Sequence, residues 1–530
     1  MVAGVELTYN TSASAMQMAQ TIFGDGVTVT SASYTGATGS SAIYSNGQLS
    51  TGVVPSTTGV ILSTGNAASF TTTNWYQSNT STSTSTNTSG VDNNTQFNQV
   101  AGATTYDAAW LDVNFIPTGN VMTIQFVFSS EEFPEYSGTI YNDTVGVWIN
   151  GQVVPLSVGD GDVAVGNINQ TENSNLFVSN TGDQYNTEMD GFTVTMTLTI
   201  PVNPGVVNSI KIGIADVADT QYDSNLLIAA DSVQTTLVAL DDNFTMPAGG
   251  TRTFDLLAND VNNTSGTLKI THINGVAVSV GSTVTLGTGQ VIQLNADGTI
   301  TVLNDADVEE FSFTYKVESL SGSGAVLQND TGFVKINSVP CFVAGTMILT
   351  PDGEVPVESL EPGDLVMTLD DGPQPLCWIG RREVAAEGSF APIRIRAGTF
   401  GNHRALTLSP QHRIMVRDSL AELLFGEGEV LVKAKDLVNG SSIRRLEGGT
   451  VEYVHILFDK HQVVFSEGLA SESFQPGPET TKGFDPEVLA ELVAIFPELD
   501  TQTGSGYGPS ARRTLKPFEA KVLIRNVNAA

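Results

Sequence analysis

The residues with the clearest chemical potential lie in the last third of the chain. Cys341 is one of only two cysteines, and it stands where a run of strand-like sequence stops. Four of the five histidines fall within 59 residues, from His403 to His461. A cysteine that begins a domain can fold its thiol back on the preceding carbonyl carbon and convert the peptide bond into a thioester. The bond exposed to this chemistry is Pro340–Cys341.

Such an attack needs groups that polarise the carbonyl, protonate the departing amine and raise the thiolate fraction. Ser409 and His412 are three residues apart between two apolar runs, so both can reach one backbone amide. His455 follows 43 residues after His412, and His461 lies on the same segment. Their even spacing places both on one strand face, where a Zn²⁺ pair is an alternative that lacks a well-spaced third ligand.

The segment CFVAGTMILTPDGEVPVESLEPGDLVMT resembles the opening block of Hint domains, which inteins, Hedgehog autoprocessing domains and bacterial intein-like domains share. The likeness continues in order through PLCWIGRR, APIRIRAG, LTLSPQHRIMV, GEVLVKAKDLVNG and VEYVHILFDKHQVVFSEGLASESFQPG, over about 135 residues. It implies an all-β horseshoe of two pseudo-twofold related halves across residues 341–475.

The resemblance assigns roles to three residues near the start of this region. It implies that Cys341 is the nucleophile and that His412 contacts the scissile amide and protonates its nitrogen. Ser409 stands where most members have threonine, and its hydroxyl can make the same hydrogen bond without the methyl group that fixes the rotamer. Cys377, in an apolar run before Trp378, is interpreted as inert core.

The late block departs from splicing members of the family. His461 matches the histidine of that block, but His455 stands where splicing members have a catalytic aspartate, and Asp459 is a candidate substitute. The block ends without an asparagine followed by Cys, Ser or Thr, so ligation should fail. The resemblance therefore implies cleavage, or transfer of the thioester to an outside nucleophile, with the chain as its own substrate and no required cofactor. Pro340 restricts the residue before it, which favours slow or triggered cleavage.

The sequence before residue 238 predicts a β domain of the kind found in secreted proteins. Residues 1–237 contain short apolar or alternating runs separated by Gly, Asn and Asp, which predict a β-sandwich. The run FVFSSEEFPEY, Asn142-Asp143, VGVWINGQ and DVADTQYDSNLLI resemble bacterial choice-of-anchor domains. The spacing also predicts a helix over 12–23, and residues 78–90, a Ser/Thr/Asn repeat, predict a mobile surface loop.

Two further regions complete the expected organisation. Residues 238–340 predict an Ig-like or cadherin-like sandwich of about seven strands that resembles adhesin repeats. Residues 476–530 predict a helical tail, with a helix over 485–496. The expected fold class is therefore mainly β and multidomain. The alternative to self-processing is a non-catalytic bacterial surface adhesin in which the Hint fold is only a structural cap.

Composition limits the partners. The net charge is −33, and only five of the 23 Lys and Arg residues precede residue 341, so nucleic acid and anionic membranes are disfavoured. No apolar run is long enough to span a membrane, and the start lacks a cleavable signal pattern. The expectation is an extracellular or cell-surface bacterial protein exported by another route.

Carboxylates in the front domain could recruit Ca²⁺, which prefers oxygen ligands. The alternative is that they lie in solvated acidic loops. The candidate ligands are Glu131, Glu132, Asp143, Asp216, Asp219 and Asp223.

Overall fold

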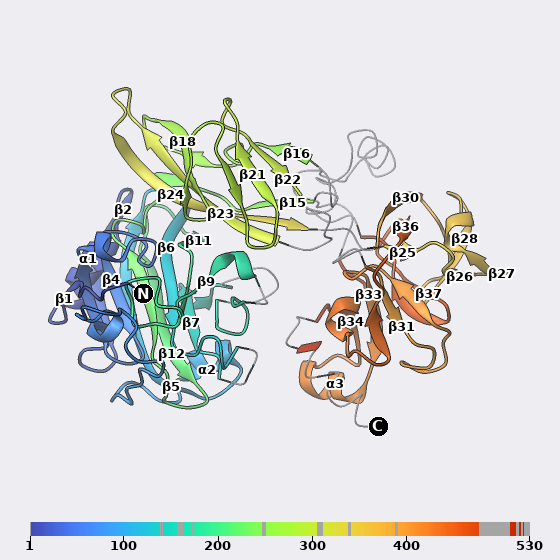
Figure 1. Ribbon diagram of the computed structural model, residues 1–530, viewed down its shortest axis with the longest axis horizontal. Coiled ribbons are helices and arrows are strands. Elements are labelled where there is room, and N and C mark those ends of the chain that lie inside the picture. The colour runs from blue at the N-terminus through green and yellow to red at the C-terminus, as the bar shows by residue number, and fades with distance from the viewer. Residues whose placement is uncertain are drawn as a thin grey trace. The chain divides into compact units, whose positions relative to one another are not determined.

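The computed structural model describes residues 2–137, 139, 141–155, 163–170, 173–245, 251–304, 311–337, 341–386, 391–475, 509–515, 519–520 and 523. The chain divides into two units. The first comprises Met1–Asp242, Thr253–Val302 and Phe311–Val334, and the second comprises Asn243–Arg252, Leu303–Glu310 and Lys335–Ala530. Antiparallel strands dominate both (Figure 1). The prediction of a mainly β, multidomain chain is confirmed.

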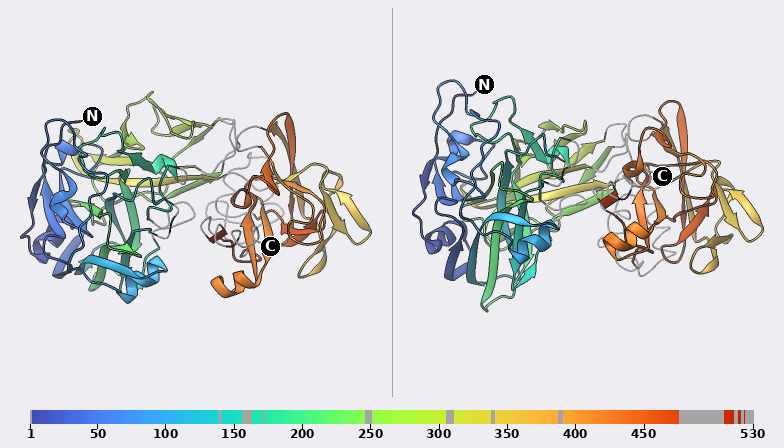
Figure 2. Two further views of the ribbon diagram at one scale, coloured as in Figure 1. Left: turned by 60° about the horizontal axis from the view of Figure 1, so that its bottom comes forward. Right: turned by 90° about the horizontal axis from the view of Figure 1, so that it is seen from below.

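The front of the first unit is a sandwich of two antiparallel sheets (Figure 2). Their inner faces share one apolar core, to which β4, β6 and β13 contribute from one sheet and β5, β7 and β12 from the other. The larger sheet has the order β1 (Thr8–Asn10), β3 (Ser41–Ser45), β4 (Thr58–Ser63), β13 (Ser224–Ala229), β6 (Val121–Ser130), β10 (Gly191–Thr193) and β9 (Phe177–Ser179), with β11 (Met196–Pro201) also on β6. The smaller sheet has the order β2 (Val27–Thr35), β5 (Thr105–Pro117), β12 (Asn208–Val217), β7 (Thr144–Ile149) and β8 (Gln152–Val153).

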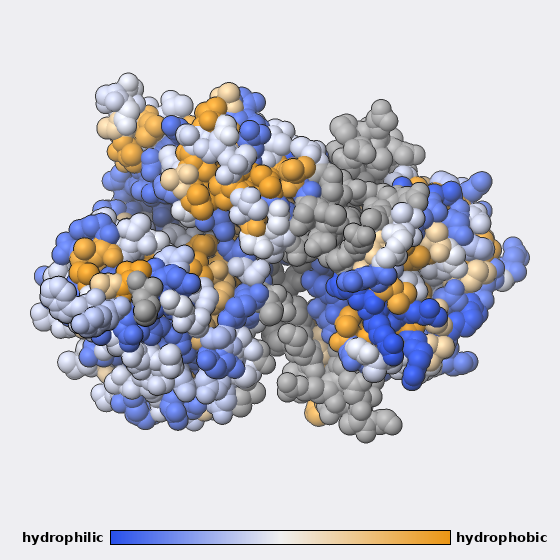
Figure 3. Space-filling view, in the orientation of Figure 1, coloured by the Kyte–Doolittle hydropathy of each residue, from blue (hydrophilic) through white to orange (hydrophobic). Residues whose placement is uncertain are grey.

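Residue alternation decides which face of the smaller sheet is buried. In β12, Ile210, Ile212 and Ile214 belong to the core, while Ser209 and Lys211 point to the opposite face. Each fully buried aliphatic side chain contributes roughly 1.5–3 kcal/mol. The outer face carries exposed polar side chains such as Ser31, Ser33 and Asn114, and under α2 it carries a second buried apolar cluster that includes Phe97, Trp110 and Trp148. Figure 3 shows many hydrophilic and intermediate residues over the sandwich in this view.

Two short helices accompany the sandwich. α1 (Ala15–Ile22) begins at the N-cap Ser14, whose side chain forms a capping box with Gln17. Its buried residues are Met18, Ala19 and Ile22, so the helix predicted over 12–23 is confirmed with slightly shorter bounds. α2 (Thr95–Ala101) is capped by Asn94 and ends at Gly102, which adopts a left-handed conformation.

Two further antiparallel sheets follow between residues 242 and 337. The described residues of this region form nine strands in these two sheets, where the sequence predicts about seven. The sheets are β15 (Asp242–Thr245), β24 (Val326–Asn337), β23 (Phe311–Leu320), β18 (Thr267–Ile273) and β19 (Val276–Ala277), and β16 (Thr251–Phe254), β22 (Ile300–Leu303), β21 (Val291–Leu294) and β20 (Thr283–Thr285). A separate pair joins β14 (Leu237–Val238) to β17 (Val261–Asn262).

The second unit contains two sheets that place the candidate catalytic residues. One has the order β30 (Trp378–Ala385), β36 (Thr450–Leu457), β25 (Phe342–Val343), β32 (Leu406–Leu408), β31 (Ile393–Ile395) and β35 (Ile443–Arg445). The other has the order β27 (Gly353–Pro356), β26 (Met347–Thr350), β37 (Val463–Ser466), β38 (Leu469–Glu472), β33 (Arg413–Arg417) and β34 (Glu429–Lys433), with β28 (Leu365–Thr368) and β29 (Gly372–Pro375) beside β37. One helix, α3 (Ser419–Phe425), follows β33.

Part of the C-terminal tail belongs to this unit. Leu431 of β34 donates its N–H to Arg513 O at 2.8 Å and accepts from Leu515 N at 2.8 Å, as in a parallel strand pair. Leu515, Ala520 and Leu523 are buried in the core of the unit. The helix predicted over 485–496 lies outside the described residues.

Within the described ranges, no helix combines the length and hydropathy that a membrane crossing requires.

Candidate active site

Strand pairing places Cys341 between two other chain segments. β25 lies between β32 and β36, and Phe342 is paired with both Leu408 and Val454. In an antiparallel pair, the residue before Phe342 lies opposite the residue that follows each of its two partners. Cys341 is therefore beside Ser409 on one side and His455 on the other, although these positions are 68 and 114 residues away.

Ser409 is hydrogen-bonded to both the backbone N–H and the backbone carbonyl of Cys341. Cys341 N–H donates to Ser409 Oγ at 2.8 Å, and Ser409 N–H donates to Cys341 O at 3.0 Å. Ser409 is 1% exposed. The amide nitrogen of the predicted scissile bond thus has a fixed hydroxyl partner. Pro340, which supplies the carbonyl, lies outside the described residues.

The thiol of Cys341 faces an imidazole. Cys341 Sγ lies 3.3 Å from His455 Nε2, and both side chains are buried. Val451 and Tyr453 pack beside the cysteine. Burial, and then the nearby thiol of Cys341, raise the pKa of Tyr453. A thiol in contact with an imidazole can pass its proton to the ring and become a nucleophilic thiolate.

His412 completes this group from the turn that begins at Ser409. Its N–H donates to Ser409 O at 3.1 Å, and its ring packs edge-on against Phe342 with centroids 4.4 Å apart. Burial lowers the pKa of His412 to about 4, although Glu472 and the backbone of Cys341 oppose the shift. Burial thus favours the neutral form of this imidazole.

Glu472 is a site residue that the sequence analysis missed. Its carboxylate is 1% exposed and accepts from Arg413 N at 2.8 Å and Arg413 Nη1 at 3.1 Å. Burial pushes the pKa of Glu472 upward, but Arg413 and His461 outweigh that effect and hold the pKa at about 2. The available signal was a lone acidic residue in the short run Leu469–Phe474, which is otherwise small or apolar.

His461 belongs with Glu472 rather than with the thiol. Its Nε2 lies 3.3 Å from Glu472 Oε2, and its Nδ1 accepts the N–H of Ala511 at 3.0 Å. Because Nδ1 accepts, a neutral His461 must carry its proton on Nε2, which faces the carboxylate. The hydroxyl of Ser510 is a second neighbour of Nδ1, at 3.4 Å. The tail thus selects the tautomer of this histidine.

Asp459 lies apart from the other candidates. It is exposed on the turn after β36. Its charge acts on Cys377, where burial first and Asp459 second raise the pKa of the thiol. The structure thus joins Cys341, Ser409, His412 and His455, and leaves Asp459 outside this group.

Family models match two regions of the chain. Residues 340–478 match the Hint domain family, and residues 7–234 match the Choice-of-anchor L domain family. The chain carries a Hint domain behind a choice-of-anchor L domain. A Hint domain confers a general capacity for self-processing, and a choice-of-anchor domain indicates a cell-surface or secreted protein.

Solved structures similar to this chain include inteins. The bacterial intein-like domain from Clostridium thermocellum is 19% identical, covers 25% of this chain and 97% of its own, and has a TM-score of 0.20. The MchDnaB-1 intein is 13% identical, covers 25% of this chain and 98% of its own, and has a TM-score of 0.18. A search of curated proteins gave no match.

The predicted calcium ligands all lie in the choice-of-anchor domain. Five of them, Glu131, Glu132, Asp143, Asp216 and Asp223, are at most 3% exposed, so they do not lie in solvated loops. Asp219 is only partly exposed. Among the described residues, no three His, Cys, Asp or Glu side chains are grouped so that they could hold a metal ion. Calcium binding stays a prediction.

The low-complexity segment 78–90 lines buried carboxylates of the same domain, of which Asp223 is one of the predicted calcium ligands. Thr80 donates its N–H to Glu188 Oε2 at 2.7 Å, and Thr86 donates its N–H to Asp223 Oδ1 at 2.6 Å. Thr88 Oγ1 donates to Asp107 Oδ1 at 2.5 Å. The expectation of a mobile surface loop overlooked this pairing, in which a Ser/Thr repeat supplies hydroxyl and amide donors to carboxylates that have no ion-pair partner among the residues the structure describes.

The Glu472 pairing yields a stability prediction. Glu472→Gln should lower the unfolding midpoint of the second unit at pH 7, because removing one partner of a buried pair costs roughly 3–5 kcal/mol. The pKa of Glu472 is depressed in the folded state, so its stabilisation exists above its usual range near 4.5 and is lost as the pH falls through about 2. Differential scanning calorimetry at pH 7 and pH 3 should show a smaller penalty at pH 3. Glu447→Gln, at an exposed position, is the control.

The buried Glu131 should give stability the opposite dependence on pH. Burial, and then Asp190, raise the pKa of Glu131 to about 9, although a side-chain hydrogen bond with Thr84 opposes the shift. A raised folded-state pKa gives stability that is complete below about 4.5 and is lost as the pH rises through 9. Glu131→Gln should therefore raise the unfolding midpoint at pH 8 and change it little at pH 4. A lower midpoint at pH 8 without added metal would contradict this.

Proposed function

We propose that the Hint domain cleaves its own chain at Pro340–Cys341 by an N-to-S acyl shift. The Sγ of Cys341 attacks the carbonyl carbon of Pro340, and the thiol proton passes to His455 Nε2. The C–N bond then breaks, the nitrogen of Cys341 takes up a proton to become an amine, and residue 340 is left as a thioester on Sγ. Water or an outside nucleophile resolves the thioester and releases the N-terminal β domains.

One observation carries the proposal: both reacting ends of Cys341 are held at once. The thiol lies 3.3 Å from a histidine nitrogen, and the backbone N–H lies 2.8 Å from the hydroxyl of Ser409. A core cysteine would need neither partner. Holding reacting groups in place removes the entropy cost of bringing them together during the reaction.

His412 is assigned the proton transfer to the departing nitrogen. Its ring lies against Phe342, the residue after the nucleophile, and its pKa near 4 makes the protonated form a strong acid. Because that form is rare at pH 7, the second step is slow unless something perturbs the site. This agrees with the slow or triggered cleavage that Pro340 favours.

His455 stands where splicing members have a catalytic aspartate, but here it is assigned the role of base for the thiol. Its nitrogen contacts the thiol directly, so it acts in the first step as the base. His461 and Glu472 act as positioning residues, because their contacts are with Arg413 and the tail. The proposal uses no cofactor.

The released part would function outside the cell or on its surface. The choice-of-anchor match supports this location, and an external nucleophile or a surface acceptor could take over the acyl group at residue 340. Without such an acceptor, hydrolysis frees the β domains.

Cleavage itself is the first prediction of this proposal. Full-length wild type treated with dithiothreitol should give fragments of 340 and 190 residues on a denaturing gel, and intact mass spectrometry should locate the cut before Cys341. Cys341→Ala should stay whole. Ser409→Thr keeps the hydroxyl and should cleave, whereas Ser409→Ala should be slower. If wild type and Cys341→Ala both remain intact, the structural-cap alternative is favoured.

The role of His455 is tested by rate. General acid–base help is worth roughly 10²–10⁴-fold, so His455→Ala should slow thiol-induced cleavage by about that factor at pH 7. Raising the pH should recover part of the rate, because hydroxide can then form the thiolate. His403→Ala removes a histidine of the same domain whose contacts are with its own turn, and it should leave the rate unchanged. Equal rates for His455→Ala and wild type would remove His455 from the mechanism.

A further inference from the structure

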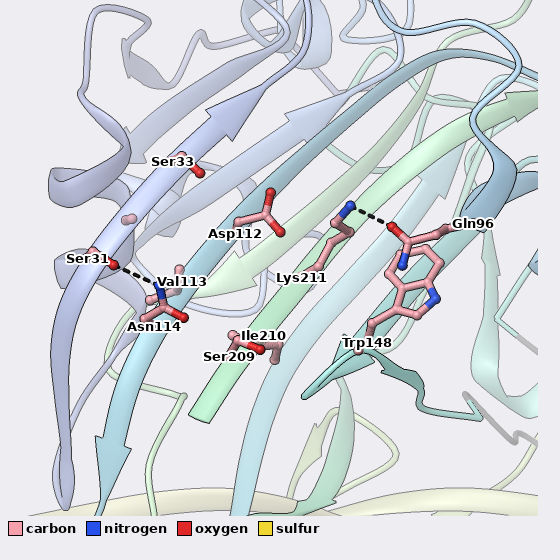
Figure 4. Close-up of a pocket in the computed structure, with 12 residues that line it drawn as sticks. Ser31, Ser33, Gln96, Asp112, Val113, Asn114, Trp148, Ser209, Ile210 and Lys211 are labelled. Atoms are coloured by element: carbon pink, nitrogen blue, oxygen red, sulfur yellow. Dashed lines mark hydrogen bonds between the residues drawn. The ribbon is translucent and has the colours of Figure 1, made fainter. Parts of the chain in front are cut away.

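The outer face of the smaller sheet in the choice-of-anchor domain carries a polar hollow that the cleavage reaction does not use. It has a volume of about 500 Å³, within the range of small-molecule sites. Strands β2, β5, β12 and β7 form its floor, and Gln96 of α2 stands at its edge (Figure 4).

Strand register assembles this surface in two rows. Ser33, Asp112, Lys211 and Trp148 are consecutive partners across the four strands. Ser31, Asn114 and Ser209 form the neighbouring row. These residues alternate with the buried core positions, so all seven share the outer face.

Three polar groups of the hollow are each held by a neighbour and keep unused hydrogen-bonding capacity. Asp112 Oδ2 accepts from Trp110 Nε1 at 2.8 Å, which leaves Oδ1 open. Asn114 Nδ2 donates to Ser31 Oγ at 2.9 Å, which leaves its carbonyl oxygen open. Lys211 Nζ donates to Gln96 Oε1 at 2.7 Å and has two further protons.

Lys211 and Asp112 are opposite one another but are held apart. Lys211 Nζ lies 4.6 Å from the ring centroid of Trp110, a cation–π contact, and no ion pair to Asp112 occurs among the described residues. Lys211 is also the first basic residue of the chain, and the next is Arg252. A site that holds one acceptor and one donor group in this way suits a partner that both donates and accepts.

Trp148 stands at the border of the hollow as a buried support. A Cβ at Gly146 would approach Trp148 Cη2 to 2.3 Å, so this glycine lets the ring lie against the sheet. Trp148 is 5% exposed, and its ring packs edge-on against Phe97 of α2.

We propose that this hollow binds a neutral saccharide. Adjacent hydroxyl groups can donate to Asp112 Oδ1 and to the carbonyl oxygen of Asn114, and they can accept from Lys211. One positive and one negative group balance locally, so the ligand needs no charge. The net charge of −33 disfavours an anionic ligand, and Lys211 disfavours a cationic one.

Native affinity electrophoresis tests the proposal with the full-length protein. Gels would contain soluble β-glucan, xylan, mannan or the anionic polysaccharide alginate. Wild type should be retarded by at least one neutral polysaccharide and not by alginate. Asp112→Ala, Asn114→Ala and Lys211→Met should each weaken the retardation about tenfold or more, and Lys211→Met keeps the aliphatic stem over Trp110.

Trp75→Ala is the matched control, because Trp75 is 90% exposed and lies outside the hollow. It should migrate as wild type does in every gel, and thermal melts should show that all variants are folded. The proposal is overturned if no neutral polysaccharide retards the wild type, if alginate alone does, or if the hollow variants are retarded as strongly as wild type.

Discussion

The candidate site depends on the pairing of the two-residue strand β25 between β32 and β36. Phe342 is fully buried and is paired with Leu408 on one side and Val454 on the other. This register alone sets Cys341 beside Ser409 and His455. A shift of one residue would turn every side chain of β25 to the other face and separate the thiol from the imidazole.

Electrostatics is handled differently in the two units. In the Hint domain the buried Glu472 has Arg413 and His461 as partners, and its pKa falls to about 2. In the choice-of-anchor domain, which is almost free of Lys and Arg, burial raises the pKa of Glu131 to about 9. There, the hydroxyls and amides of segment 78–90 take the place of cations for several neighbouring carboxylates. The same side-chain type is thus charged in one unit and protonated at neutral pH in the other.

The tail shows that the working domain extends beyond the sequence blocks that resemble the Hint family. The family match ends at residue 478, yet Leu515 is buried in the core and Ala511 donates to His461. Arg512 also forms ion pairs with Asp370 and Glu429, which hold this segment against the domain. A search for functional residues confined to the matched blocks would have missed its effect on the histidine tautomer.

The sequence by itself determined the mainly β class and the helix near the start, and it named six catalytic candidates, of which the structure brings four together. It could do so because residue alternation, helix capping and ordered motif blocks depend only on residues that are near one another along the chain. The tertiary structure decided that His455 contacts the thiol, that Asp459 does not join the site and that Glu472 does. It also decided that segment 78–90 pairs with carboxylates, and it aligned Asp112, Lys211 and Trp148 in one row. Each of these depends on strand register between distant segments, and register is fixed by packing of the whole sheet rather than by neighbours along the chain.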